Sequence, residues 1–288
     1  MENIYTIEND VLSVSVSDAG AQLQRVELKT SGDALLWEGD PAVWKDRSPW
    51  LFPVIGQLKD GRFLWQGRSY GLPMHGFAKR LYFTLEARTE SSLRFVLRDT
   101  PETLAVYPWR FELAIEYVLS GRRLDVTCRV VNRSEGVMYY SLGAHPGLLC
   151  REGDRLRFGA DCLAYRQLEK GSHLLLPEET ALPLEDGCLT LKSSLFNNDA
   201  LIFERPGVTE LTLLRRKGPN VRVRFDEVPW LGVWSRGEAY GDLKYVCVEP
   251  WLGVDDPVDA DGQIEHKTGI QSLDAGGERT FSVSIESI

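Results

Sequence analysis

The chain of 288 residues carries 33 lysines and arginines against 42 aspartates and glutamates, which gives a net charge of −9. This acidic balance disfavours nucleic acid as a partner, and no apolar run approaches the roughly 20 residues that span a bilayer, so no membrane is expected either. With 43% hydrophobic and 26% charged residues, the composition is that of a globular protein and excludes a disordered or fibrous chain.

Alternating apolar and polar residues dominate the chain and predict β-strands with one buried face. The alternation recurs, in chain order, at residues 11–17, 93–98, 111–119, 124–131, 221–225 and 281–285. Helical signals are few. Asp40-Pro41 predicts the start of one short helix, and Thr100-Pro101 predicts the start of another.

Many short strands without a linker or an internal repeat favour one architecture. We expect an all-β fold, a large antiparallel β-sandwich, formed by residues 1–288 as a single domain. The first residues lack the charged and apolar regions of a secretory signal, and the five cysteines are scattered singly. A reducing cytoplasm is therefore the expected compartment.

Motifs for several common chemistries are missing from the sequence. Neither a phosphate-binding glycine loop nor the GxSxG elbow of hydrolases occurs. The four histidines form no metal-binding spacing, and the acidic run 255–262 has Pro257 where a calcium loop needs an acid. We therefore expect no cofactor and no metal, and we interpret the acidic run as a solvated loop.

Two titratable residues stand out because each ends a strand-like run and precedes a proline. They are His145 and Glu249. Proline lacks an amide donor and keeps its predecessor extended, so both side chains are expected at a sheet margin. Strand parity places Gly143 on the face of His145, where a missing side chain leaves room. On another strand it places Trp230, Gly232 and Trp234 on one face, where Gly232 leaves a gap between the two indole rings.

A histidine and a glutamate that face one cavity can act as a general acid–base pair. Each well-placed group contributes about 10²–10⁴ in rate. The same residues also suit structural roles. His145 and His75 could be hydrogen-bonded turn residues, Glu249 a salt-bridging carboxylate, and Trp234 and Trp251 core residues. The pattern alone leaves these alternatives open.

Three segments together resemble the aldose 1-epimerase (galactose mutarotase-like) family, in its shorter bacterial branch. They are His75-Gly76-Phe77, Gly143-Ala144-His145-Pro146 and Glu249-Pro250-Trp251, in that family's order and spacing. The similarity runs nearly from end to end. It implies a β-supersandwich with an open sugar-binding cleft, and an isomerase that interconverts the α and β anomers of free aldoses without a cofactor.

The resemblance also implies roles for individual residues. Glu249 would be the general base that takes the proton of the anomeric hydroxyl, and His145 the general acid that protonates the ring oxygen. His75 would bind the ring-oxygen region. Asp199 would bind sugar hydroxyls, although an Asx turn between strands explains it equally well.

One departure from the family concerns the segment after Pro-Val-Ile-Gly, where the family commonly has an arginine and this chain has Gln57. Glutamine has fewer donors and no charge. Either Gln57 binds a different hydroxyl pattern, or Arg47, Arg62 or Arg80 replaces the arginine. The substrate-binding candidates are Asp199, Gln57, Trp234, Arg80 and Trp251.

The expected partner is a small sugar, either a free aldose or a sugar phosphate, and the expected assembly is a monomer or a homodimer. A hexose-6-phosphate epimerase would need converging basic groups, for which Lys79, Arg80 and Arg47 are candidates. A noncatalytic carbohydrate-binding module would not need the acid–base pair. Glycoside hydrolysis is disfavoured because no second carboxylate has a placement comparable to that of Glu249.

Overall fold

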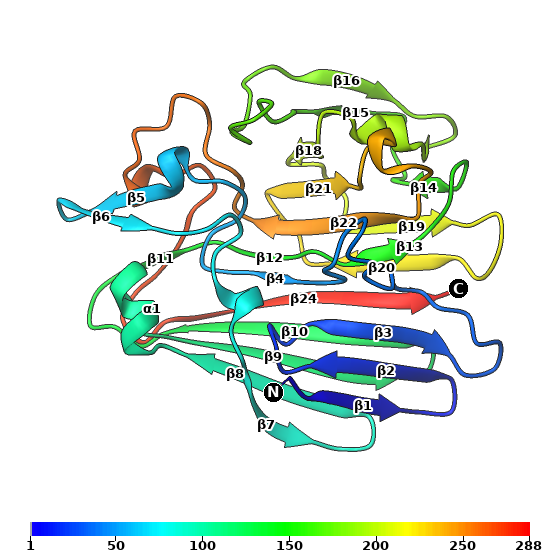
Figure 1. The fold of residues 1–288 in the computed structure, drawn as a ribbon, viewed down its shortest axis with the longest axis horizontal. Coiled ribbons are helices and arrows are strands. Elements are labelled where there is room, and N and C mark those ends of the chain that lie inside the picture. Colours follow the sequence, from blue (N-terminus) through cyan, green and yellow to red (C-terminus); the bar gives the residue numbers. More distant parts are fainter. Residues whose placement is uncertain (1) are drawn as a thin grey trace.

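The largest element of the computed structural model, which describes residues 2–288, is an antiparallel sheet of nine strands. In spatial order, these are β17 (Cys188–Thr190), β14 (Arg155–Arg157), β19 (Glu210–Leu214), β20 (Val221–Phe225), β24 (Glu278–Ser287), β10 (Arg123–Asn132), β9 (Phe111–Ser120), β8 (Ser92–Arg98) and β7 (Thr84–Arg88). Figure 1 shows that the chain ends in this sheet, at the red strand β24.

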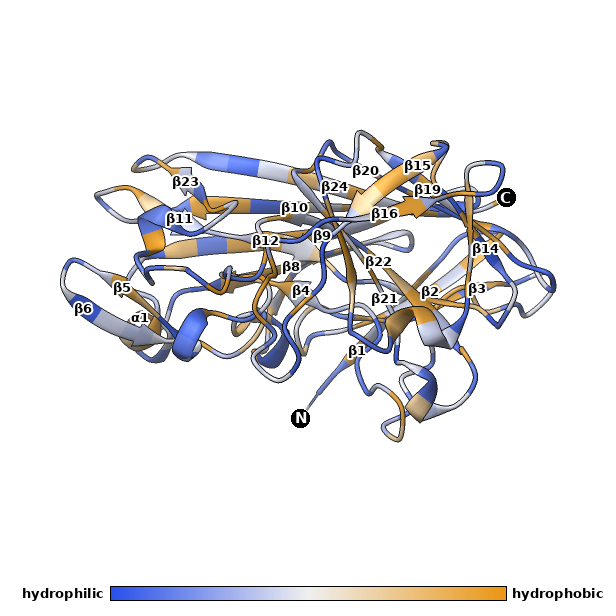
Figure 2. Cartoon of the chain, turned by 90° about the horizontal axis from the view of Figure 1, so that it is seen from above, coloured by the Kyte–Doolittle hydropathy of each residue, from blue (hydrophilic) through white to orange (hydrophobic). Residues whose placement is uncertain are grey.

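A six-stranded sheet and a three-stranded sheet form further layers. The six-stranded sheet contains, in order, β18 (Leu201–Glu204), β21 (Trp230–Trp234), β22 (Tyr245–Leu252), β12 (Leu142–Ala144) and β4 (Trp50–Leu51), while β13 (Gly147–Leu149) also pairs with β22. The three-stranded sheet contains β1 (Ile4–Glu8), β2 (Leu12–Ser17) and β3 (Leu23–Leu28). Seen from above, β10, β20 and β24 lie along one side of the molecule, and β2, β3 and β21 along the other (Figure 2).

Three two-stranded ribbons and a few short helices complete the fold. The ribbons are β5 (Arg62–Trp65) with β6 (Arg68–Gly71), β11 (Met138–Tyr140) with β23 (Gln271–Leu273), and β15 (Cys162–Tyr165) with β16 (Thr180–Pro183). The helices are α1 (Pro101–Val106) and the 3₁₀ turns η1 (Lys59–Gly61), η2 (Ala78–Arg80), η3 (Ser193–Phe196), η4 (Glu238–Tyr240) and η5 (Ile264–His266). Between residues 2 and 288, no helix has the length and apolarity needed to cross a bilayer.

The all-β prediction is confirmed, since each of the six alternating runs forms a strand: β2, β8, β9, β10, β20 and β24. Their inward side chains share one core. Val14 of β2, Val126 of β10 and Leu231 of β21 are 0%, 3% and 0% exposed and belong to the same cluster of buried residues. Because sheets from three layers bury their apolar faces together, the architecture is a sandwich.

One of the two helix predictions is confirmed and the other is wrong. Thr100 caps α1, and its hydroxyl accepts the backbone N–H of Thr103 at 3.3 Å. At Asp40 the chain forms a single turn, in which the Trp44 N–H donates to the Asp40 carbonyl at 2.8 Å. The helix does not continue. The N–H groups of Arg47 and Ser48 donate to the Gln22 side chain at 2.7 Å and 3.3 Å, and the Trp44 carbonyl accepts the indole N–H of Trp37 at 2.8 Å.

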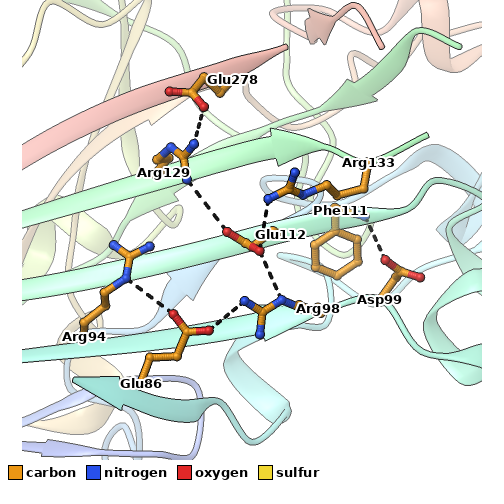
Figure 3. Close-up of polar contacts among 9 residues, drawn as sticks. All are labelled: Glu86, Arg94, Arg98, Asp99, Phe111, Glu112, Arg129, Arg133 and Glu278. Carbon is orange, nitrogen blue, oxygen red and sulfur yellow. Dashed lines mark hydrogen bonds and ion pairs between the residues drawn. The ribbon is translucent and has the colours of Figure 1, made fainter. Parts of the chain in front are cut away.

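A network of charged side chains covers part of the outer face of the nine-stranded sheet (Figure 3). Its centre is Glu112 of β9, which is 7% exposed. The Glu112 carboxylate lies 3.1 Å from Arg98, 3.3 Å from Arg133 and 3.8 Å from Arg129. Burial raises the pKa of Glu112, but the arginines outweigh burial and hold the pKa below its usual value.

Replacing Glu112 by Ala is expected to lower the free energy of unfolding by about 1–2 kcal/mol at neutral pH. Three guanidinium groups then lose their shared carboxylate. The expected loss is modest because each arginine is partly solvated, and a single solvated ion pair contributes little to stability. Since the folded pKa lies below the reference value of 4.5, the contribution is present above that pH and disappears as the pH falls through the folded pKa. Urea denaturation at pH 7 and pH 3 measures both effects. Exposed Glu227 provides the control, and an equal loss in Glu227→Ala would contradict the role of the network.

Candidate active site

A cavity of about 240 Å³ opens where loops meet the six-stranded sheet. β22 and the residue that follows β12 form its floor. The segments before β4, after β6, between β15 and β16, before β18 and after β21 form its walls. Its titratable lining residues are His75, Lys79, His145, His173, Asp199, Arg236, Glu249 and Asp255. The cavity therefore gathers acids, bases and cations from distant parts of the chain.

The strand that carries Glu249 does not end at this residue, contrary to the sequence prediction. β22 continues through Pro250 to Leu252 and pairs with β21 from Cys247 to Trp251. Pairing stops on the opposite side only, where His145 and Pro146 separate β12 from β13. The Val248 N–H reaches the Pro146 carbonyl on that side, so by strand parity the absent amide of Pro250 also faces the gap. The gap brings His145 opposite Glu249.

The two residues of the predicted acid–base pair are in contact. Glu249 Oε2 lies 3.0 Å from His145 Nε2, and both residues line the cavity. The contact lies outside hydrogen-bond geometry, and Glu249 Oε2 has no hydrogen-bond partner among the described residues. Glu249 is 1% exposed and His145 is 7% exposed, so both residues line the cavity while most of each side chain is buried.

Burial sets the charge of this pair. Desolvation lowers the pKa of His145 to about 3. Desolvation also raises the pKa of Glu249 well above its usual value, and the carboxylates of Asp199 and Asp255 raise it further. Burial therefore disfavours charge on both residues, favouring the neutral imidazole and the protonated carboxyl group.

His75 contributes a second imidazole, whose ring lies edge-to-face with that of His145 at a centroid distance of 5.8 Å. The Gly56 N–H donates to His75 Nδ1 at 3.0 Å. This bond assigns Nδ1 as an acceptor, so the neutral ring carries its proton on Nε2. Burial, followed by the charge of Lys79, lowers the pKa of His75 well below its usual value. His75 is thus a neutral hydrogen-bond donor.

Aromatic rings surround His145. Trp44 stacks on the imidazole at 5.1 Å, and Trp234 meets it edge-on at 5.6 Å. The room predicted beside Gly143 is filled by the indole of Trp251, because a Cβ atom at Gly143 would lie 2.5 Å from Trp251 Cδ1. Gly143 thus makes space for Trp251 rather than for a ligand. Trp251 lines the cavity although it is only 3% exposed.

Asp199 lies at the rim of the cavity in a left-handed backbone conformation, with φ of 72°. One carboxylate oxygen accepts the backbone N–H of Ala200 at 2.9 Å, and the other lies 3.0 Å from His173 Nδ1. The bond to Ala200 reaches the next residue, whereas an Asx turn bonds the backbone two residues on, so the expected Asx turn does not form. The partly exposed carboxylate stays a candidate for binding sugar hydroxyls. His173 was missed because its sequence surroundings are those of an ordinary loop.

The structure does not bring two of the substrate-binding candidates into the cavity. Gln57 lies outside the lining, where its side-chain amide donates to the Leu58 carbonyl at 2.9 Å. Arg80 is exposed, whereas its neighbour Lys79 lines the cavity. Both lie in η2, and successive side chains of a 3₁₀ helix diverge by about 120°. An inward Lys79 therefore directs Arg80 outward.

The suggested replacements for the family arginine also lie elsewhere. Arg47 donates to Gln24 at 2.6 Å, and Arg62 lies on the surface near Asp60. The arginine that does line the cavity is Arg236, which the sequence analysis did not select. No sequence signal marks it, because its position follows from the bend after β21.

Arg236 is held by neutral groups. Its Nε donates to the Val43 carbonyl at 3.1 Å. Its guanidinium lies over the rings of Trp234 and Tyr240, at 5.4 Å and 4.7 Å from their centroids. It forms no ion pair with any residue between 2 and 288. A fixed cation without a carboxylate partner is able to bind an anionic group on a ligand.

Comparison with known proteins agrees with this fold. The chain matches the sequence model of the aldose 1-epimerase family over residues 3–270. It is 30% identical to the chromosomal LacX protein of Lactococcus lactis subsp. lactis, over 97% of this chain and 98% of that protein. The chain belongs to the aldose 1-epimerase family.

Solved structures share the fold over nearly the whole chain. A galactose mutarotase related enzyme from Lactobacillus acidophilus is 32% identical, with a TM-score of 0.92 and coverage of 99% of this chain and 97% of that one. A galactose mutarotase-like protein from Lactobacillus casei has a TM-score of 0.91 at 23% identity, with coverage of 99% and 100%. The latter likeness shows the fold alone.

Proposed function

We propose that this protein is a cofactor-independent aldose 1-epimerase that interconverts the α and β anomers of a hexose. The observation that carries the proposal is the contact between Glu249 and His145 at the floor of a cavity of about 240 Å³. We infer that the two residues share one proton. Mutarotation needs one proton taken from the anomeric hydroxyl and one delivered to the ring oxygen. The pair performs both transfers with no net gain or loss of protons.

The reaction begins with the proton on His145 and a carboxylate at Glu249. Glu249 takes the proton of the anomeric hydroxyl while His145 protonates the ring oxygen, and the C1–O5 bond breaks. The carboxyl group and the imidazole are then both neutral, which is the state that burial favours. Burial therefore favours the neutral pair that ring opening leaves and disfavours the charged pair that the step needs at its start. Rotation about C1–C2 and the reverse transfers give the other anomer.

The remaining lining residues are proposed to hold the sugar during this cycle. His75 donates from Nε2 toward the ring-oxygen region, because its Nδ1 is engaged by Gly56. Asp199 accepts sugar hydroxyls at the rim, and the partly exposed ring of Trp234 packs against an apolar sugar face. Polarimetry of freshly dissolved α-glucose and α-galactose tests this function. Rates equal to those in buffer across a panel of aldoses and their 6-phosphates would favour a noncatalytic sugar-binding module.

The pH dependence of kcat/KM tests the shared proton. The pair gains a second proton only when the pH approaches the His145 pKa of about 3, so the acid limb should lie far below 6.5, the ordinary pKa of histidine. Activity is lost at high pH, where Glu249 gives up the proton. An acid limb at 6.5 would contradict this account. Burial raises the pKa of Asp255 to about 6, which is close to the ordinary pKa of histidine. Asp255→Asn is therefore the control that shows whether a limb near pH 6 comes from Asp255.

A second candidate function, epimerisation of a hexose phosphate, is favoured by Arg236. Its guanidinium is fixed at the cavity without a carboxylate partner, and Lys79 lies in the same lining. Replacing Arg236 by Gln should lower kcat/KM for a hexose 6-phosphate by roughly 10–100-fold, the value of one or two hydrogen bonds to a charged group. Free hexoses should lose much less.

The control for this experiment is Arg80→Gln, which removes a nearby positive charge outside the cavity. NMR measurement of anomer exchange supplies kcat/KM for glucose and glucose 6-phosphate with each variant. Equal losses for both sugars in Arg236→Gln would exclude a phosphate-specific role for this residue. Equal losses in Arg80→Gln would indicate long-range electrostatics instead of a contact.

A further inference from the structure

A thiol lies beside the pair at the floor of the cavity. Cys247 precedes Glu249 by two residues in β22, so strand parity places both side chains on the same face. The ligand atoms of His145, Cys247 and Glu249 all lie within 4.8 Å of one another. The three residues are 7%, 0% and 1% exposed. The proposed reaction uses the imidazole and the carboxyl group but gives the thiol no part.

Polar atoms in this cluster lack partners. Glu249 Oε2 and His145 Nδ1 are buried and form no hydrogen bond of good geometry with any described residue. Unpaired polar atoms are costly in an interior, and a group of them frequently marks a ligand or ion site. The Glu249 carboxyl group is directed toward His145, within reach of the Cys247 sulfur.

The donor set is one nitrogen, one sulfur and one carboxylate oxygen. This combination suits Zn²⁺, which binds thiolate, imidazole and carboxylate ligands at about 2.0–2.3 Å. Such bond lengths place tetrahedral ligand atoms roughly 3.3–3.7 Å apart, so the cluster closes around an ion with shifts of about 1 Å. Mg²⁺ and Ca²⁺ prefer oxygen ligands only and fit poorly.

We infer that His145, Cys247 and Glu249 form a Zn²⁺-binding site whose fourth position opens toward the cavity. Binding releases the thiol proton of Cys247 and the proton shared by the other two residues, so two protons leave for each ion bound. The same imidazole and carboxylate cannot transfer protons while they bind a metal. Zn²⁺ therefore acts as an inhibitor of mutarotation, a consequence that rests on the proposed function.

Co²⁺ is the probe for the site, because a thiolate ligand gives Co²⁺ a charge-transfer absorption in the near ultraviolet. We expect this band in the wild-type protein with one ion bound, its loss when Zn²⁺ is added, and no effect of Mg²⁺. Cys247→Ser and Cys247→Ala should lose the band and bind Zn²⁺ more than roughly tenfold more weakly in calorimetry. Cys128→Ser, an equally buried thiol in β10, and Cys162→Ser, an exposed thiol, should retain both.

The outcomes separate the metal site from the enzymatic function. A band that persists in both Cys247 variants, or one that disappears in Cys162→Ser, overturns the site. If neither Cys247 variant folds, the Cys162→Ser protein decides, because absence of the band there also overturns the proposal. A Co²⁺ band in a protein that does not accelerate mutarotation supports the metal site and rejects the function. Accelerated mutarotation by a wild-type protein that shows no Co²⁺ band rejects the metal site and supports the function.

Discussion

Glu249→Gln is expected to lower the rate of mutarotation by about 10²–10⁴ and to leave the fold intact. Burial raises the pKa of Glu249 and so favours its protonated carboxyl group, and a neutral amide of the same size replaces it without a new charge in the interior. The amide cannot take the proton of the anomeric hydroxyl. A rate loss of this size corresponds to about 3–5 kcal/mol of transition-state stabilisation.

Polarimetry and thermal denaturation measure the two parts of this prediction. The matched control is Glu238→Gln, which changes an exposed glutamate in η4 and should retain the wild-type rate. The double variant with His145→Asn should be little slower than either single variant, because the two groups act as one unit. Additive losses would show that the two residues act independently and would contradict a shared proton.

Gly76→Ala is expected to destabilise the fold by about 3 kcal/mol or more. Gly76 has φ of 68°, and a Cβ atom there would lie 2.3 Å from the backbone carbonyl oxygen of Phe52. That oxygen also accepts the N–H groups of Phe77 and Ala78, at 3.0 Å and 3.1 Å, so it cannot move away without breaking both bonds. The methyl group therefore adds a backbone clash to the strain of a left-handed conformation.

Gly67→Ala separates these two contributions. Gly67 lies in the β5–β6 turn with φ of 73°, and a Cβ atom there would meet nothing within 4 Å. It should therefore show only the conformational strain, about 1–2 kcal/mol. Urea denaturation gives both free energies of unfolding. Equal losses at the two glycines would show that the contact with Phe52 adds nothing.

Strands were predictable from the sequence where they alternate, because alternation records a buried and a solvated face. β9 and β10, with their long apolar–polar repeats, are examples. β22 was harder to delimit, since all its residues are buried and it contains Pro250. Its true length depends on the break between β12 and β13, which releases that proline from pairing. Such a break is a property of the neighbouring strands and leaves no mark on β22 itself.

The candidate site was predictable as far as residues precede prolines or match the family pattern. His145 and Glu249 satisfy both conditions, and they lie in contact. Arg236 could not be selected, because its position depends on stacking between Trp234 and Tyr240 across a turn. The sequence analysis selected Arg80 instead, because a sequence pattern does not show that the 3₁₀ turn directs its side chain outward. Side chains that converge from loops are determined by tertiary packing, which a linear pattern does not record.

The central claim is that the protein accelerates anomer exchange through the proton shared by Glu249 and His145. NMR exchange spectroscopy measures this most directly, with the wild type and Glu249→Gln, on an equilibrated panel of aldoses and their 6-phosphates at neutral pH. The account predicts exchange well above the buffer rate for at least one sugar in the wild type, reduced about 10²–10⁴-fold in the variant. Exchange at the buffer rate for every sugar, or equal acceleration by both proteins, would contradict it.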